Sequence, residues 1–166
     1  MRGRALFLFA AAAGLAAACE DSTDPDATYS ATLLGANERP NAVTTTATGT
    51  FSATLDDNGI LTYTVSFTGL TSNSNNAHIH GPIPATGNAT APVLVDFNQP
   101  TSGRTITLGA TSGTGSGTID LKLAAPNNAN VSGDSLKVLL NTAKLYVNVH
   151  SANNGGGEIL GNIIKQ

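Results

Sequence analysis

Three histidines are the side chains of this 166-residue sequence with the clearest capacity for chemistry, and two of them stand in Asn76-Ala77-His78-Ile79-His80. An imidazole nitrogen can bind a transition metal or exchange a proton near neutral pH. In a β-strand alternate side chains point to the same face, so His78 and His80 would share a face that Ile79 does not. Their Cα atoms would lie roughly 7 Å apart, which lets both rings reach one metal ion.

The third histidine, His150, comes shortly before Glu158. If residues 151–157 form a hairpin loop, these two residues lie opposite each other and can meet across the strands. We therefore expect Glu158 to hydrogen-bond or ion-pair with a histidine. His78, His80, His150 and Glu158 become candidate ligands of a single metal ion. The alternative is that the histidines are structural and hydrogen-bond to the backbone or to Glu158.

The register of that hairpin also predicts which residues face the core. It pairs apolar residues on one face: Val149 with Ile159, Val147 with Gly161 and Leu145 with Ile163. A shift of one residue would send half of these side chains to the wrong face.

The strongest local signal for strands lies at residues 48–55 and 60–67, which flank Asp56-Asp57-Asn58-Gly59. An Asn-Gly pair between two alternating segments is typical of a tight β-hairpin. In the second segment the hydrophobic positions alternate with threonine and serine, which predicts a strand with one buried face. The residues expected to face inward are Leu61, Tyr63, Val65 and Phe67.

Further short strands are expected at residues 29–34, 78–80, 93–97, 106–108, 118–123, 145–150 and 158–164. The glycine-rich residues 113–117 suggest an edge or bulge where side chains would collide, and they lack the spacing of a phosphate-binding loop. Residues 135–141 have helical spacing, with Asp134 or Ser132 available as N-cap. The fold class predicted is all-β: an antiparallel, Greek-key-like β-sandwich of about eight short strands with at most one short helix.

The N-terminus has the features of an export signal. Arg2 and Arg4 precede an apolar segment that ends at Cys19, the single cysteine. Residues 16–19 are similar to the lipobox of bacterial lipoproteins, so residues 1–18 are expected to be a signal peptide and Cys19 the lipidation site. The alternative is ordinary cleavage that leaves a free thiol. Residues 19–27 are acidic and polar and would form a tether, with one domain at residues 28–166.

Composition excludes several classes of function. The formal net charge is −3, and loss of the leader would remove two of the eight basic residues, so no nucleic-acid partner is expected. One cysteine cannot form a disulfide within the chain. No serine lies in a G-x-S-x-G motif, and Asp56-Asp57 belongs to the turn rather than to a pair of catalytic carboxylates.

Three motifs in order give the sequence its resemblance to the chordin-type (CHRD) domain family. They are Leu34-Gly35-Ala36-Asn37-Glu38-Arg39-Pro40, Ala77-His78-Ile79-His80-Gly81-Pro82, and Tyr146-Val147-Asn148-Val149-His150 leading to Gly157-Glu158-Ile159-Leu160-Gly161. Leu160 stands where the family usually has arginine, and Asn41 where a second proline is common. The resemblance covers residues 28–164 and implies an extracytoplasmic β-sandwich module, without implying a reaction.

Two functions remain open. The first is an exported, lipid-anchored, non-catalytic binding or structural module, attached to a membrane through Cys19 in the periplasm or at the cell surface and meeting an unknown protein or small ligand. The second is a mononuclear metalloprotein with one Cu or Zn ion and weak redox or hydrolytic activity. The His-x-His strand is similar to that of Cu/Zn superoxide dismutase. That enzyme uses six histidines and an aspartate for two metals, so three histidines cannot complete its site.

Overall fold

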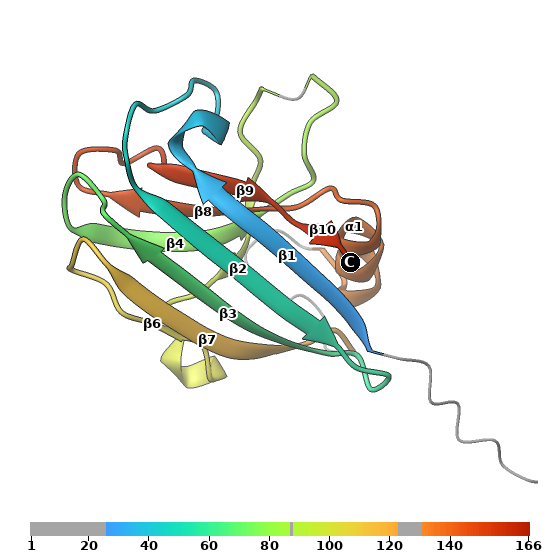
Figure 1. Cartoon of the computed structure of the whole chain (residues 1–166). Coiled ribbons are helices and arrows are strands. Elements are labelled where there is room, and N and C mark those ends of the chain that lie inside the picture. Colours follow the sequence, from blue (N-terminus) through green and yellow to red (C-terminus); the bar gives the residue numbers. More distant parts are fainter. Residues whose placement is uncertain (1–25, 87, 123–130) are drawn as a thin grey trace, which may run out of the picture.

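The structure, a computed structural model, describes residues 26–86, 88–122 and 131–166. These form one ten-stranded sheet, one α-helix and two short 3₁₀ helices (Figure 1). The strands are β1 (Ala27–Leu34), β2 (Thr48–Leu55), β3 (Ile60–Thr68), β4 (Ser74–His80), β5 (Val93–Asp96), β6 (Thr105–Ile106), β7 (Gly113–Asp120), β8 (Tyr146–Ser151), β9 (Ile159–Asn162) and β10 (Ile164–Lys165). The helices are α1 (Gly133–Asn141), η1 (Gly35–Asn37) and η2 (Pro100–Ser102).

The strand order is β5-β4-β8-β9-β1-β2-β3-β7-β6, with β10 paired to β1, and every pairing is antiparallel. The sheet curls so that β4 and β8 lie behind β2 and β3 (Figure 1). The predicted class, an antiparallel β-sandwich with one short helix, is confirmed, with ten strands rather than about eight.

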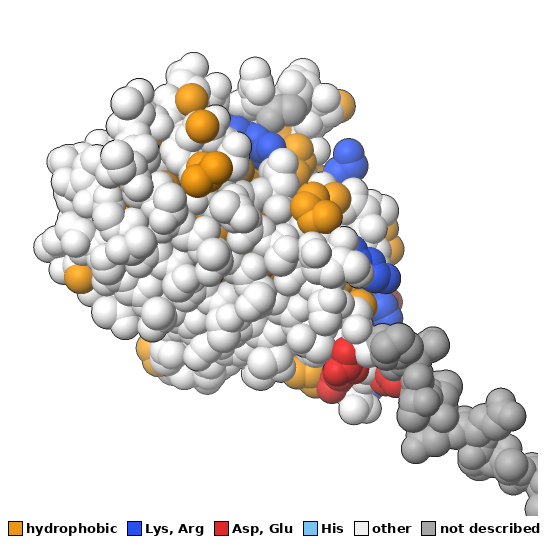
Figure 2. Space-filling model, in the orientation of Figure 1, with side chains coloured by type: hydrophobic (Ala, Val, Ile, Leu, Met, Phe, Trp, Pro, Cys, Tyr) orange, Lys and Arg blue, Asp and Glu red, His pale blue; other side chains and the backbone are white. Residues whose placement is uncertain are grey.

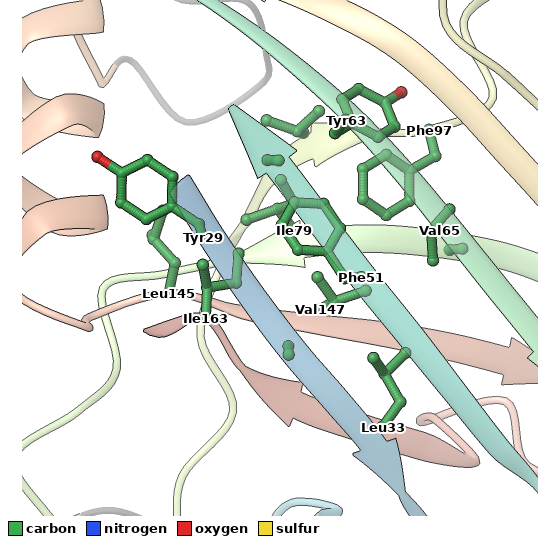
Figure 3. Close-up of a cluster of buried hydrophobic side chains, with 14 of the residues drawn as sticks. Tyr29, Leu33, Phe51, Tyr63, Val65, Ile79, Phe97, Leu145, Val147 and Ile163 are labelled. Carbon is green, nitrogen blue, oxygen red and sulfur yellow. The ribbon is translucent and has the colours of Figure 1, made fainter. Parts of the chain in front are cut away.

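The core fills the space between the two halves of the curled sheet. Phe51 of β2, Tyr63 of β3 and Phe97, which follows β5, pack ring against ring; the Tyr63 and Phe97 centroids are 4.8 Å apart (Figure 3). The inward faces expected for residues 61–67 and 145–149 are confirmed, since their alternate apolar residues are at most 3% exposed.

The β2–β3 hairpin forms at the residues the sequence indicates, with Gly59 at φ +80° in the turn. The helix begins at Gly133, two residues earlier than expected, and its N-cap is Ser132, whose side chain accepts a hydrogen bond from the Ser135 backbone.

The glycine-rich residues 113–117 differ from expectation because they lie within strand β7. An added Cβ would collide with the Phe67 ring at Gly113, with Ile106 at Gly115, and with the Tyr63 hydroxyl at Gly117. Collision was the predicted reason for the glycines; what was missed is that the strand continues through them.

Threonine and serine in register fill the middle of the outward side of β1, β2, β3 and β7, and we call these residues the hydroxyl face. Its three rows are Thr28, Thr54, Thr62, Thr118; Ser30, Ser52, Thr64, Ser116; and Thr32, Thr50, Ser66, Thr114. Figure 2 shows this surface almost free of charged side chains. In the part of the chain that is described, no helix has the length and apolar character needed to cross a membrane.

Candidate metal-binding site

The structure brings all three histidines together on the outward side of β4 and β8. His78 and His80 project from β4 and His150 from β8, and the two strands are hydrogen-bonded neighbours. One ring nitrogen from each lies within 4.8 Å of the others. His78 Nδ1 is 3.1 Å from His150 Nε2, although the residues are 72 positions apart in sequence. We call these residues the three-histidine cluster.

Backbone carbonyls orient two of the rings. His80 Nδ1 lies 2.8 Å from the Ala91 carbonyl oxygen, and His150 Nδ1 lies 3.1 Å from the Gly155 carbonyl oxygen. A carbonyl only accepts, so in each ring Nδ1 carries the proton and Nε2 keeps its lone pair. His80 Nε2 is buried and has no hydrogen-bond partner among the described residues. Such backbone contacts orient metal-binding histidines in proteins.

Burial holds the cluster in its neutral form. It lowers the pKa of His78 to about 4, with His150 and His80 contributing in the same direction. Burial also lowers the pKa of His80 and of His150, although their carbonyl contacts act the other way. All three imidazoles are therefore uncharged at neutral pH, the state in which they can donate to a metal.

One side of the cluster is closed by an aromatic ring. Tyr146 stacks on His80 with centroids 5.0 Å apart and planes inclined by 3°. The Arg39 guanidinium lies 4.8 Å from the Tyr146 centroid, and the Tyr146 hydroxyl accepts a hydrogen bond from the Ala91 backbone. The other side opens into a hollow lined by Asn75, Asn76, His78, His150 and Gly155.

The structure places Glu158 outside the cluster, and the predicted hydrogen bond to a histidine is wrong. Its carboxylate accepts hydrogen bonds from the hydroxyl of Thr45, the backbone and hydroxyl of Thr71, the hydroxyl of Ser151 and the amide of Asn154. The side chain is fully buried. Desolvation would raise its pKa, but these donors prevail and lower it.

Glu158 lies outside the cluster because the chain bends before β9. The predicted pairs Val147–Gly161 and Val149–Ile159 are confirmed. The strand begins only at Ile159, after Gly157 at φ +130°, so the alternation that would place Glu158 beside His150 is interrupted. Its side chain instead meets Ser151, which points to the face opposite His150.

A second buried carboxyl, Glu38, was missed from sequence. It lies over β8, where it accepts hydrogen bonds from the Asn148 amide and the Arg39 backbone. Burial raises its pKa to about 7 despite these donors. Among the described residues neither Glu38 Oε1 nor Asn148 Oδ1 has a partner. The available signal was that Glu38, Asn148 and Tyr146 all stand in the motifs that carry the family resemblance.

The comparisons with known proteins identify the family. The CHRD domain matches residues 29–163, and the chain belongs to the CHRD domain family. No curated protein matches the sequence significantly. Among solved structures the chain is similar to a mutant of superoxide dismutase 5 from Candida albicans, with 17% identity and a TM-score of 0.46, over 85% of this chain and 92% of that one. The expected signal peptide and lipidation site, residues 1–19, lie outside the described residues.

Proposed function

We propose that this protein is an exported, lipid-anchored CHRD module that binds one transition-metal ion, Cu or Zn, through His78, His80 and His150. The observation that carries the proposal is the convergence of three ring nitrogens within 4.8 Å of one another. The alternative function, a metal-free structural or binding module, would leave the buried His80 Nε2 without any partner in the described part of the chain.

The cluster fits such an ion in size and chemistry. Two nitrogens that each lie about 2.0–2.1 Å from one ion can be at most roughly 4.2 Å apart. The separation of 3.1 Å between His78 and His150 is within that limit, and the largest separation of 4.8 Å needs only a small ring movement. Neutral imidazoles without thiolates suit Cu and Zn. We assign the module a binding function, because these residues by themselves do not imply a reaction.

Metal titration of the mature domain tests the proposal. We expect one equivalent of Cu(II) or Zn(II) to bind and to survive mild dialysis. At a free-metal concentration of 100 times Kd the native state gains about 2.7 kcal/mol, which raises Tm by roughly 5–10 °C.

Variants distinguish the cluster from adventitious binding. His78→Ala and His150→Ala should each lower the metal affinity by more than roughly 10- to 100-fold. That range is the cost of losing a residue that only hydrogen-bonds to a metal ligand. Thr64→Ala, on the hydroxyl face, is the matched control and should bind as the wild type does. Absence of retained metal in the wild type, or equal affinity in all variants, would refute the proposal.

The anchor has its own test. Cys19→Ser should move the protein from the membrane fraction to the soluble fraction, because Cys19 is the sole cysteine and directly follows the apolar leader. Unchanged membrane association would contradict lipidation at Cys19 and would leave metal binding unaffected.

A further inference from the structure

The three-histidine cluster has one closed and one open side, and the difference bears on what else the metal can bind. Tyr146 covers His80, which is only 8% exposed. His78 and His150 line the hollow, whose volume is about 350 Å³. Three protein ligands leave a position free in four-coordinate geometry, and an open position distinguishes reactive from structural zinc sites.

Asn76 is placed to serve a ligand that enters from the hollow. It precedes His78 by two residues on β4, and it is the cross-strand partner of His150. Its side chain is therefore on the same face as both rings and lines the same hollow. Its Oδ1 accepts a hydrogen bond from the Ala77 backbone at 3.0 Å, which leaves the amide Nδ2 as the available donor.

Charge indicates the class of ligand. Three neutral imidazoles add no negative charge, so a divalent ion would keep its full charge at this site. One carboxylate, that of Asp96, interacts electrostatically with His78 from the neighbouring position on β5. Even with the Asp96 carboxylate nearby, a divalent ion would keep a net positive charge beside the Asn76 donor amide, and this combination favours a small anion over a neutral or cationic molecule.

Building on the proposed metal function, we infer that the bound metal keeps one coordination position open toward the hollow and takes a small exogenous anion there. The Asn76 amide donates a hydrogen bond to this anion. Asn76 is a positioning residue for the ligand and is not itself a metal ligand.

Azide titration of the Cu(II)-loaded protein tests this inference. Binding is monitored by the near-ultraviolet charge-transfer absorption of the copper–azide complex, and copper retention is measured in parallel. Asn75→Leu, at an exposed position that lines the hollow, should weaken azide binding at least about tenfold while copper affinity stays within about twofold. Asn73→Leu is the matched control, because Asn73 is exposed nearby in the chain but does not line the hollow.

Asn76→Ala should weaken azide binding about 3- to 10-fold, the value of one hydrogen bond, again without loss of copper. Copper binding with no azide spectrum would overturn this inference and leave the proposed function standing. Equal azide affinities in Asn75→Leu and Asn73→Leu would show that the anion does not enter through the hollow, which also overturns the inference. Absence of copper binding would refute the proposed function itself and this inference with it.

Discussion

Strands β3 and β8 show how differently the two halves of one sheet are used. Along β3 buried and more exposed residues alternate, as expected for a strand with core on one side and solvent on the other. All six residues of β8 are buried. The inward residues of both strands belong to the same core, so the difference lies on the outward side.

Apart from Ile60 at the start of the strand, the outward residues of β3 are threonine and serine, and side chains of the hydroxyl face hydrogen-bond to one another. Thr50 and Ser66 hydrogen-bond at 2.8 Å, as do Ser52 and Thr64. The outward residues of β8 are Tyr146, Asn148 and His150, which meet Arg39, Glu38 and Gly155 from loops. On its outward side β3 therefore carries hydroxyl groups that bond to one another, whereas β8 contributes His150 to the three-histidine cluster.

The largest effect is expected from a charge on a face that has no access to solvent. Val147→Asp places an unpaired carboxylate at a fully buried position of β8 and should cost several kcal/mol, comparable with the whole stability of a small domain. Thr64→Asp, on the exposed side of β3, should change the free energy of unfolding by less than about 1 kcal/mol. Denaturant unfolding of both variants measures the difference; similar midpoints would contradict the comparison.

A smaller but still large effect is expected at Glu158. Glu158→Gln keeps the shape but turns an acceptor into a donor that faces other donors, which should cost about 2–4 kcal/mol. Asp57→Asn, in the exposed hairpin turn, is the control and should be nearly neutral. Because the folded pKa of Glu158 is lowered, its contribution is present above the unfolded value of 4.5 and is lost as pH falls through the folded pKa. The stability difference between wild type and Glu158→Gln should therefore shrink in acid.

Glu38 should show the opposite pH dependence. Its folded pKa is raised to about 7 from 4.5, so its protonated form stabilises the fold, and this contribution is lost as pH rises from 4.5 through 7. Glu38→Gln cannot ionise and should gain stability relative to wild type between pH 5 and pH 8, by on the order of 1–3 kcal/mol. A difference independent of pH, measured by unfolding across this range, would show that Glu38 is not desolvated in solution.

The smallest effect is expected on the hydroxyl face. Thr64→Ala removes the hydrogen bond to Ser52 at an exposed position, so unfolding should change by less than about 1 kcal/mol. Metal affinity should not change at all. A loss of metal binding would mean that the two halves of the sheet are coupled, and the division of roles between β3 and β8 would be wrong.

The sequence by itself determined the local features of this protein. Alternation of apolar and hydroxyl residues is a property of each strand, so the β2–β3 hairpin, the inward faces of β3 and β8 and the class of fold could all be predicted. Ser132 was one of the two N-cap candidates, and a cap can be predicted from sequence because it depends only on the following turn. The His-x-His spacing predicted that His78 and His80 share a face of the strand.

Only the tertiary structure decided which strands became neighbours and where side chains turned at strand ends. His150 joins the cluster because β8 pairs with β4, a choice between distant segments that no local pattern specifies. Glu158 leaves it because the chain bends after Gly157, where alternation no longer applies. Burial of Glu38 and the orientation of His80 by Ala91 depend on loops that fold over β8, and these contacts arise from packing between segments far apart in sequence.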